Sequence, residues 1–137
     1  MMLLAMALAA VSPPGNFQFG GGRAWYDAAS VSRCVREAVI CADLALREGT
    51  PAQAVAYLQA GAKAGDPLAM RSLGLMLVRG EHVRRDQPTA LGWFYEAALR
   101  GDAESMLILA TAFDRGIGTK ADPRLARYWR ARADARR

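Results

Sequence analysis

The sequence has few of the residues that bind metals or carry nucleophilic and acid–base chemistry. Its 137 residues include one histidine, His82, and two cysteines, Cys34 and Cys41. A structural zinc site needs about four such ligands, and His82 lies far along the chain from both cysteines. No serine, cysteine or carboxylate stands in a pattern that pairs a nucleophile with a base. We therefore predict no metal, no cofactor and no catalytic residues.

Long apolar runs are also missing, which excludes a transmembrane segment. Residues 1–11, MMLLAMALAAV, have about the length of a signal-peptide core and are too short to span a bilayer. Ala7-Leu8-Ala9 resembles a small-x-small cleavage site, but the first basic residue is Arg23. We expect a secretory signal peptide and a periplasmic or secreted protein. The alternatives are a miscalled gene start or an apolar extension on a cytoplasmic protein.

β-Branched residues are sparse, whereas alanine and leucine dominate, and this composition favours helix. The length suits a single domain, and the apolar fraction of 53% is sufficient for a core and excludes global disorder. Residues 12–27 contain Pro-Pro and three consecutive glycines, which are typical of a linker. The folded domain is therefore predicted over residues 28–137.

Positive charge is concentrated at the C-terminal end. Residues 124–137 carry six arginines against one aspartate, and such a tail suits nucleic acid or an acidic surface. At 100° per residue, however, Arg124 and Arg127 point away from Trp129, which indicates a solvated helix face. No aromatic residues alternate with the basic ones. We therefore do not expect nucleic acid as a partner.

Breakers and caps divide residues 28–137 into six helices. Apolar residues recur at three- and four-residue spacing, and the helices end near glycines. Thr50, Asp66 and Asp122 each precede a proline, which is typical of an N-cap, and Asp102 caps a further helix. The first helix is predicted to run without interruption from Ser30 to Glu48. Three antiparallel pairs result, with approximate bounds 28–64, 65–100 and 101–137.

The continuous first helix decides the interpretation of the two cysteines. Seven residues of helix separate Cys34 from Cys41 by about 10 Å, whereas a disulfide needs Cα atoms within about 7 Å. The sequence thus predicts two small apolar core residues and no bridge between them.

A 36-residue period relates the three pairs, and positions 36 apart are called equivalent below. Such a repeat arises because a helix pair buries its apolar face only against the next pair. It predicts an all-α, right-handed superhelix, or solenoid. Trp93 is expected to fill the space between its own pair and the following one, and Gly74 to mark a close approach of helix axes. The equivalent positions include Gly65 and Gly101, Met70 and Met106, Leu73 and Leu109, Gly80 and Gly116, Asp86 and Asp122, Ala90 and Ala126, and Trp93 and Trp129.

Over about residues 30–137 this pattern resembles the Sel1-like repeat family, the longer-looped relatives of tetratricopeptide repeats. The second repeat carries the family's residues as Ala69, Leu73-Gly74, Gly80, Val83, Asp86, Ala90, Trp93, Ala97-Ala98 and Gly101. The chain departs from the pattern at His82, which replaces a loop glycine and predicts a less tight loop. It departs again at Asp134, which replaces an alanine and makes the last helix polar on its outer side, like a cap.

The resemblance implies a bacterial adaptor or scaffold, not an enzyme, that binds a protein or peptide on the concave face of the solenoid. First-helix positions outside the buried stripe are the candidate contacts, an apolar strip edged by arginine: Arg71, Leu75, Arg79, Leu107, Thr111 and Arg115. An ordinary solvated helix face is the alternative for these residues. Two other functions stay open. One is hydrolysis of penicillin-like compounds, credited to family members whose cysteine pairs link the two helices of a repeat, pairs that this chain lacks. The other is a partial module of a larger repeat array.

Overall fold

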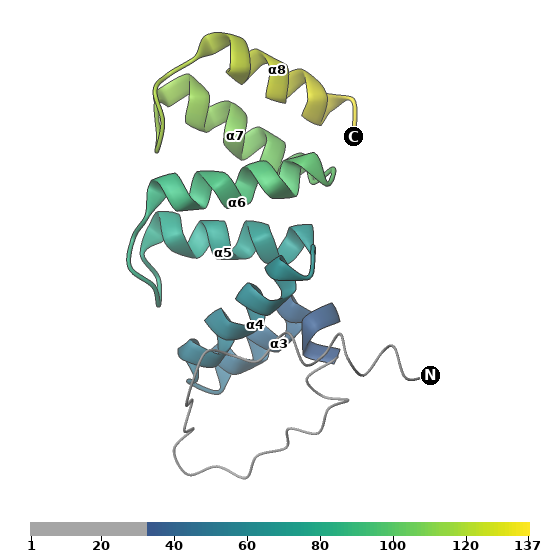
Figure 1. Ribbon diagram of the computed structural model, residues 1–137, viewed down its shortest axis with the longest axis vertical. Coiled ribbons are helices and arrows are strands. Elements are labelled where there is room, and N and C mark those ends of the chain that lie inside the picture. The colour runs from purple at the N-terminus through teal and green to yellow at the C-terminus, as the bar shows by residue number, and fades with distance from the viewer. Residues whose placement is uncertain (1–32) are drawn as a thin grey trace.

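The computed structural model describes residues 33–137 as a stack of α-helices in three pairs (Figure 1). The predicted signal peptide, linker and start of the first helix at Ser30 lie outside the described residues. A helical turn over residues 33–36 precedes six helices. These are α3 (Ala38–Arg47), α4 (Pro51–Lys63), α5 (Pro67–Arg79), α6 (Gln87–Leu99), α7 (Ala103–Arg115) and α8 (Pro123–Asp134). None of them is long and apolar enough to cross a membrane.

Aspartate caps begin the last four helices. Asp66 accepts a hydrogen bond from Leu68 N–H at 2.9 Å, and Asp86, Asp102 and Asp122 cap α6, α7 and α8 in the same way. Hydrogen bonds from the Thr89 hydroxyl and N–H hold the pKa of Asp86 below its usual range. Its contribution to stability is therefore complete at neutral pH and is lost only as the pH falls through that lowered pKa.

Thr50 occupies the N-cap position of α4, which begins at Pro51 as predicted, but the predicted side-chain cap is wrong. The Thr50 side chain makes no capping hydrogen bond to α4. Its hydroxyl instead donates to the carbonyl of Ala45 at 2.9 Å, in the preceding helix. Thr50 therefore ties α3 to the start of α4, and α4 lacks the side-chain acceptor that the four aspartates provide.

The loop between α5 and α6 keeps its shape without the family's glycine. His82 has φ +61°, and the equivalent Gly118 has φ +72°. Both residues thus occupy the left-handed region, which glycine enters freely and a residue with a β-carbon enters at some cost. The expected loosening at His82 does not occur, because the histidine adopts the backbone conformation of the glycine that it replaces.

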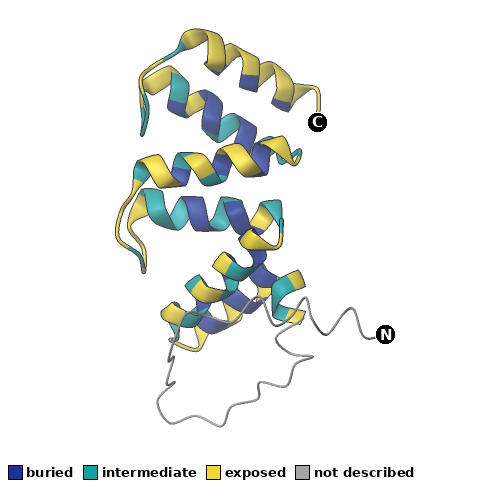
Figure 2. Ribbon diagram, viewed as in Figure 1, coloured by how far each residue is buried: buried dark blue, intermediate teal, exposed yellow. Residues whose placement is uncertain are grey.

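Each helix packs on its neighbours in the chain, and the faces that meet are buried (Figure 2). The core forms two clusters. The first joins α3, α4 and α5 with Ala97 of α6, and the second joins α6, α7 and α8. Small residues allow the helices to approach closely, as the prediction at Gly74 anticipated. A β-carbon at Gly61 would lie 2.9 Å from the Ala69 β-carbon, and one at Gly74 would lie 2.7 Å from the Phe94 ring.

The tryptophans pack differently from the prediction. Trp129 is 3% exposed and lies in the second cluster, where Tyr95 of the preceding pair meets its ring edge to face. Trp93 is only partly buried and packs against the first cluster. Trp93 therefore packs towards the first cluster and does not fill the space between its own pair and the following one. The fully buried aromatic residue of α6 is Phe94, which occupies the space left by Gly74.

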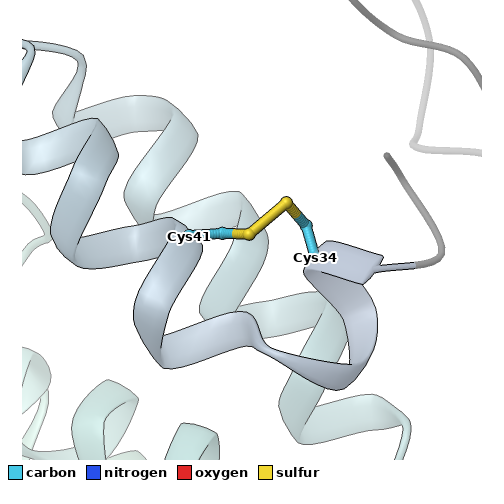
Figure 3. Close-up of a disulfide and its surroundings, with 2 residues drawn as sticks. All are labelled: Cys34 and Cys41. Carbon is cyan, nitrogen blue, oxygen red and sulfur yellow. A yellow bond between two sulfur atoms is a disulfide. The ribbon is translucent and has the colours of Figure 1, made fainter. Parts of the chain in front are cut away.

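The first helix is not continuous, and the two cysteines are bonded. Cys34 and Cys41 form a disulfide with their Cα atoms 5.6 Å apart (Figure 3). The helix breaks at Glu37, with φ −115° and ψ 41°, so that the turn over residues 33–36 folds towards Cys41. The prediction of two unbridged cysteines is wrong because the helix is broken between them, whereas an unbroken helix would hold their Cα atoms about 10 Å apart.

The last helix is polar on its outer side, as the sequence predicts. Leu91, Phe94 and Ala98 of α6 contribute to the second cluster or pack against it. In α8 the equivalent positions carry exposed charged residues, namely Arg127, Arg130 and Asp134. The outer side of α8 therefore lacks the apolar residues through which α6 joins the next pair.

Candidate partner-binding site

The six predicted contact residues lie on α5 and α7, but they are not equivalent in the structure. Arg71 is held by an ion pair: its Nη1 lies 2.8 Å from Asp102 Oδ1 and 3.1 Å from Oδ2. The Arg71 side chain is 25% exposed and that of Asp102 only 9%. Asp102 is also the N-cap of α7 and accepts hydrogen bonds from Ser105 N–H and Oγ. Arg71 thus connects two repeats and offers little free surface to a partner.

Leu107 and Thr111 line a cleft of about 280 Å³ between α6 and α7. Its volume lies near the lower limit of about 300 Å³ for ligand pockets. Leu75 is partly buried against the second core cluster. The remaining lining residues were not predicted, and most are apolar: Val78, Leu91, Phe94, Ile108, Ala112 and Ile117, with Gln87 and Glu104 as polar members.

Arg79 and Arg115 are exposed at the C-terminal ends of α5 and α7. Arg79 Nη1 lies 3.7 Å from Glu81 Oε2, and both side chains are more than half exposed. This ion pair is therefore a solvated surface contact. Arg115 lies one helical turn beyond Thr111, which lines the cleft. The two arginines place positive charge at the same end of both first helices.

The sequence missed the cleft because its lining comes from three helices and a loop. Leu91 directly follows the buried Ala90 and belongs to the second helix of its pair, whereas we took candidates from first helices alone. Only the period could have pointed to Leu91 in the sequence. Leu91 is equivalent to Val55, and both are apolar residues that pack against a core cluster.

The lining determines what the cleft can bind. Most of its surface is hydrocarbon, and Glu104, which lies 3.8 Å from Arg137, is the only charged residue that lines it. Within residues 33–137 no three histidine, cysteine, aspartate or glutamate side chains are grouped so that they would hold a metal ion. A small apolar group is therefore the ligand that this geometry suits best.

The Sel1 repeat matches the sequence three times, over residues 42–66, 67–102 and 103–133. The chain belongs to the Sel1 repeat family. Sel1 repeats form helical solenoids and generally mediate protein–protein interactions, and members of the family are typically adaptors without enzymatic activity. No curated protein matches the sequence.

Solved structures with the Sel1 fold resemble this chain. A Sel1 repeat protein from Oxalobacter formigenes is 35% identical with a TM-score of 0.60, over 62% of this chain and 25% of its own. A protective antigen of uropathogenic Escherichia coli that displays the same fold is 31% identical with a TM-score of 0.70, over 79% of this chain and 24% of its own. The chain thus spans about a quarter of each. Cysteine-rich protein B of Helicobacter pylori shares the fold at 19% identity with a TM-score of 0.64, over 85% of this chain and 93% of its own.

Proposed function

We propose that this Sel1 repeat protein is a non-enzymatic adaptor that binds an extended segment of another polypeptide along α5 and α7. The partner inserts one apolar side chain into the cleft between α6 and α7, and its carboxylates lie near Arg79 and Arg115. The observation that supports this most strongly is the cleft itself, because Leu107 and Thr111, two predicted contact residues, line an apolar hollow. A cleft of about 280 Å³ suits an amino-acid side chain better than a large cofactor.

Filling the cleft tests the site directly. Thr111 is exposed, and its hydroxyl bonds only within α7, to the Leu107 carbonyl at 3.0 Å. Thr111→Trp should therefore block the cleft and leave the fold intact. With the full-length protein, peptides selected from a displayed random library should be enriched in an apolar residue near Asp or Glu. Fluorescence anisotropy should show that T111W raises the Kd of these peptides at least about tenfold, which corresponds to about 1.4 kcal/mol of lost binding free energy.

The control for T111W is Gln59→Trp, which adds the same ring at an exposed position of α4. Q59W should bind like the parent. The double charge reversal R79E/R115E should weaken the same peptides and shift selection towards Lys and Arg, with an unchanged Tm. If T111W and Q59W bind the selected peptides equally well, the cleft is not the site.

The disulfide supports export, because disulfides persist mainly in oxidising compartments outside the cytoplasm. We propose a periplasmic or secreted protein whose first residues are removed after Ala9. It also supports a binding role over hydrolysis of penicillin-like compounds, since the bridge joins two turns of the first helical segment instead of the two helices of a pair.

Sequencing the mature N-terminus tests export. We expect a chain that begins at Ala10 in the periplasmic or extracellular fraction, with the Cys34–Cys41 disulfide detected by mass spectrometry of unreduced peptides. A soluble cytoplasmic protein that retains Met1 would contradict the proposed localisation without affecting the binding site.

A further inference from the structure

The break in the first helix at Glu37 has no local cause in the sequence. Residues 33–42, RCVREAVICA, contain neither glycine nor proline, the residues that most often interrupt a helix. Glu37 occupies the N-cap position of α3, yet α3 has no side-chain cap hydrogen bond. The backbone hydrogen bonds of the two helical segments both include this residue. Glu37 N–H donates to the Arg33 carbonyl in the preceding turn, and the Glu37 carbonyl accepts from Cys41 N–H in α3.

The other two repeats show what this segment does without a bridge. Leu73 and Leu109 are equivalent to Glu37, and both lie in the middle of unbroken helices of 13 residues. Cys34 is equivalent to Met70, and Cys41 to Leu77. The repeat with two cysteines is therefore the one whose first helix is broken between them.

Helix geometry explains this coincidence. In an unbroken helix the Cα atoms of residues seven apart are separated by about 10 Å, whereas a disulfide requires less than about 7 Å. The observed separation of 5.6 Å satisfies the second condition and violates the first. The bridge and a continuous helix through Glu37 exclude each other.

We infer that Cys34 and Cys41 form a redox switch that sets the shape of the first helix. In the disulfide form the helix is broken at Glu37, and the turn over residues 33–36 is fixed against Cys41. In the dithiol form it runs unbroken from Arg33 to Arg47, like α5 and α7. The switch therefore changes the backbone at the N-terminal end of the described helices. Ile40 and Leu44 of α3 are 58% and 51% exposed at this end.

The chemistry is thiol–disulfide exchange with a dithiol reductant. A reductant thiolate attacks the sulfur of Cys34, the more exposed of the two residues, and releases the Cys41 thiolate. The second reductant thiol then displaces Cys34 and closes the reductant's own disulfide. Two electrons and two protons pass to the cysteine pair, which ends as two thiols.

Amide hydrogen exchange of the full-length protein tests the switch, with dithiothreitol as reductant. In the dithiol form the N–H groups of Ala38, Val39 and Ile40 gain the carbonyls of residues 34–36 as helical partners. Their exchange should therefore slow by about tenfold or more, and helical ellipticity at 222 nm should rise. Amides in the middle of α7, such as that of Ala110, should keep their rates and provide the internal control.

The variant C34A/C41A should give the slow exchange with and without dithiothreitol, because alanine favours helix and forms no bridge. If this variant fails to fold, reduction of the parent protein still gives the result. The inference fails if reduction leaves the three amides unprotected or accelerates their exchange. It also fails if the air-oxidised protein contains two free thiols. None of these outcomes depends on the proposed partner-binding cleft.

Discussion

Replacing Trp129 with alanine is expected to lower the free energy of unfolding by about 3–5 kcal/mol. The indole is 3% exposed and belongs to the cluster that joins α6, α7 and α8. Its ring meets Tyr95 and Tyr128 edge to face, with centroids 5.5 Å and 5.1 Å away. The substitution removes this contact area and leaves a cavity that the helices fill only in part. Urea denaturation followed by circular dichroism measures the loss.

Trp93→Ala is the matched control, because Trp93 occupies the equivalent position one repeat earlier. Its indole is only partly buried, so W93A should cost at least about 1 kcal/mol less than W129A, in proportion to the smaller apolar area that it loses. Equal losses would contradict the deeper burial of Trp129.

Asp102→Ala should lower the free energy of unfolding by about 2–4 kcal/mol. Loss of the N-cap accounts for about 1 kcal/mol. The Ser105 hydroxyl, which donates to Asp102 at 2.6 Å and is fully buried, and the Arg71 guanidinium both lose their partner, which adds about 1–3 kcal/mol. Thermal and urea denaturation at neutral pH measure the effect.

Asp66→Ala isolates the contribution of this network. Asp66 is equivalent to Asp102 and caps α5 through Leu68 N–H, while Ala69 replaces the serine. D66A should therefore cost only about 1 kcal/mol. A D102A loss no greater than that of D66A would mean that Arg71 and Ser105 contribute nothing beyond the cap, and Arg71 would then be available as a partner contact.

The candidate site shows how far sequence reasoning reaches. Leu107 and Thr111 were chosen because they lie on a first helix outside its buried stripe, and both line the cleft. That a partner contacts them there stays a prediction. Arg71 was placed on the same strip, but its partner Asp102 is 31 residues away. The period predicts the direction in which a side chain points, but it does not predict which oppositely charged residue forms an ion pair with it.

The sequence by itself determined the last five helices, the four aspartate caps and the 36-residue stacking. Those features depend on contacts within a few residues, such as an aspartate beside the N–H groups that it caps, and on apolar spacing that repeats along the chain. Only the tertiary structure decided that Phe94 fills the space beside Gly74, that Trp129 is buried more deeply than Trp93, and that Cys34 reaches Cys41. Each of these depends on distances in space. A single disulfide or a single glycine changes those distances, but it does not change the 36-residue period from which the helices were predicted.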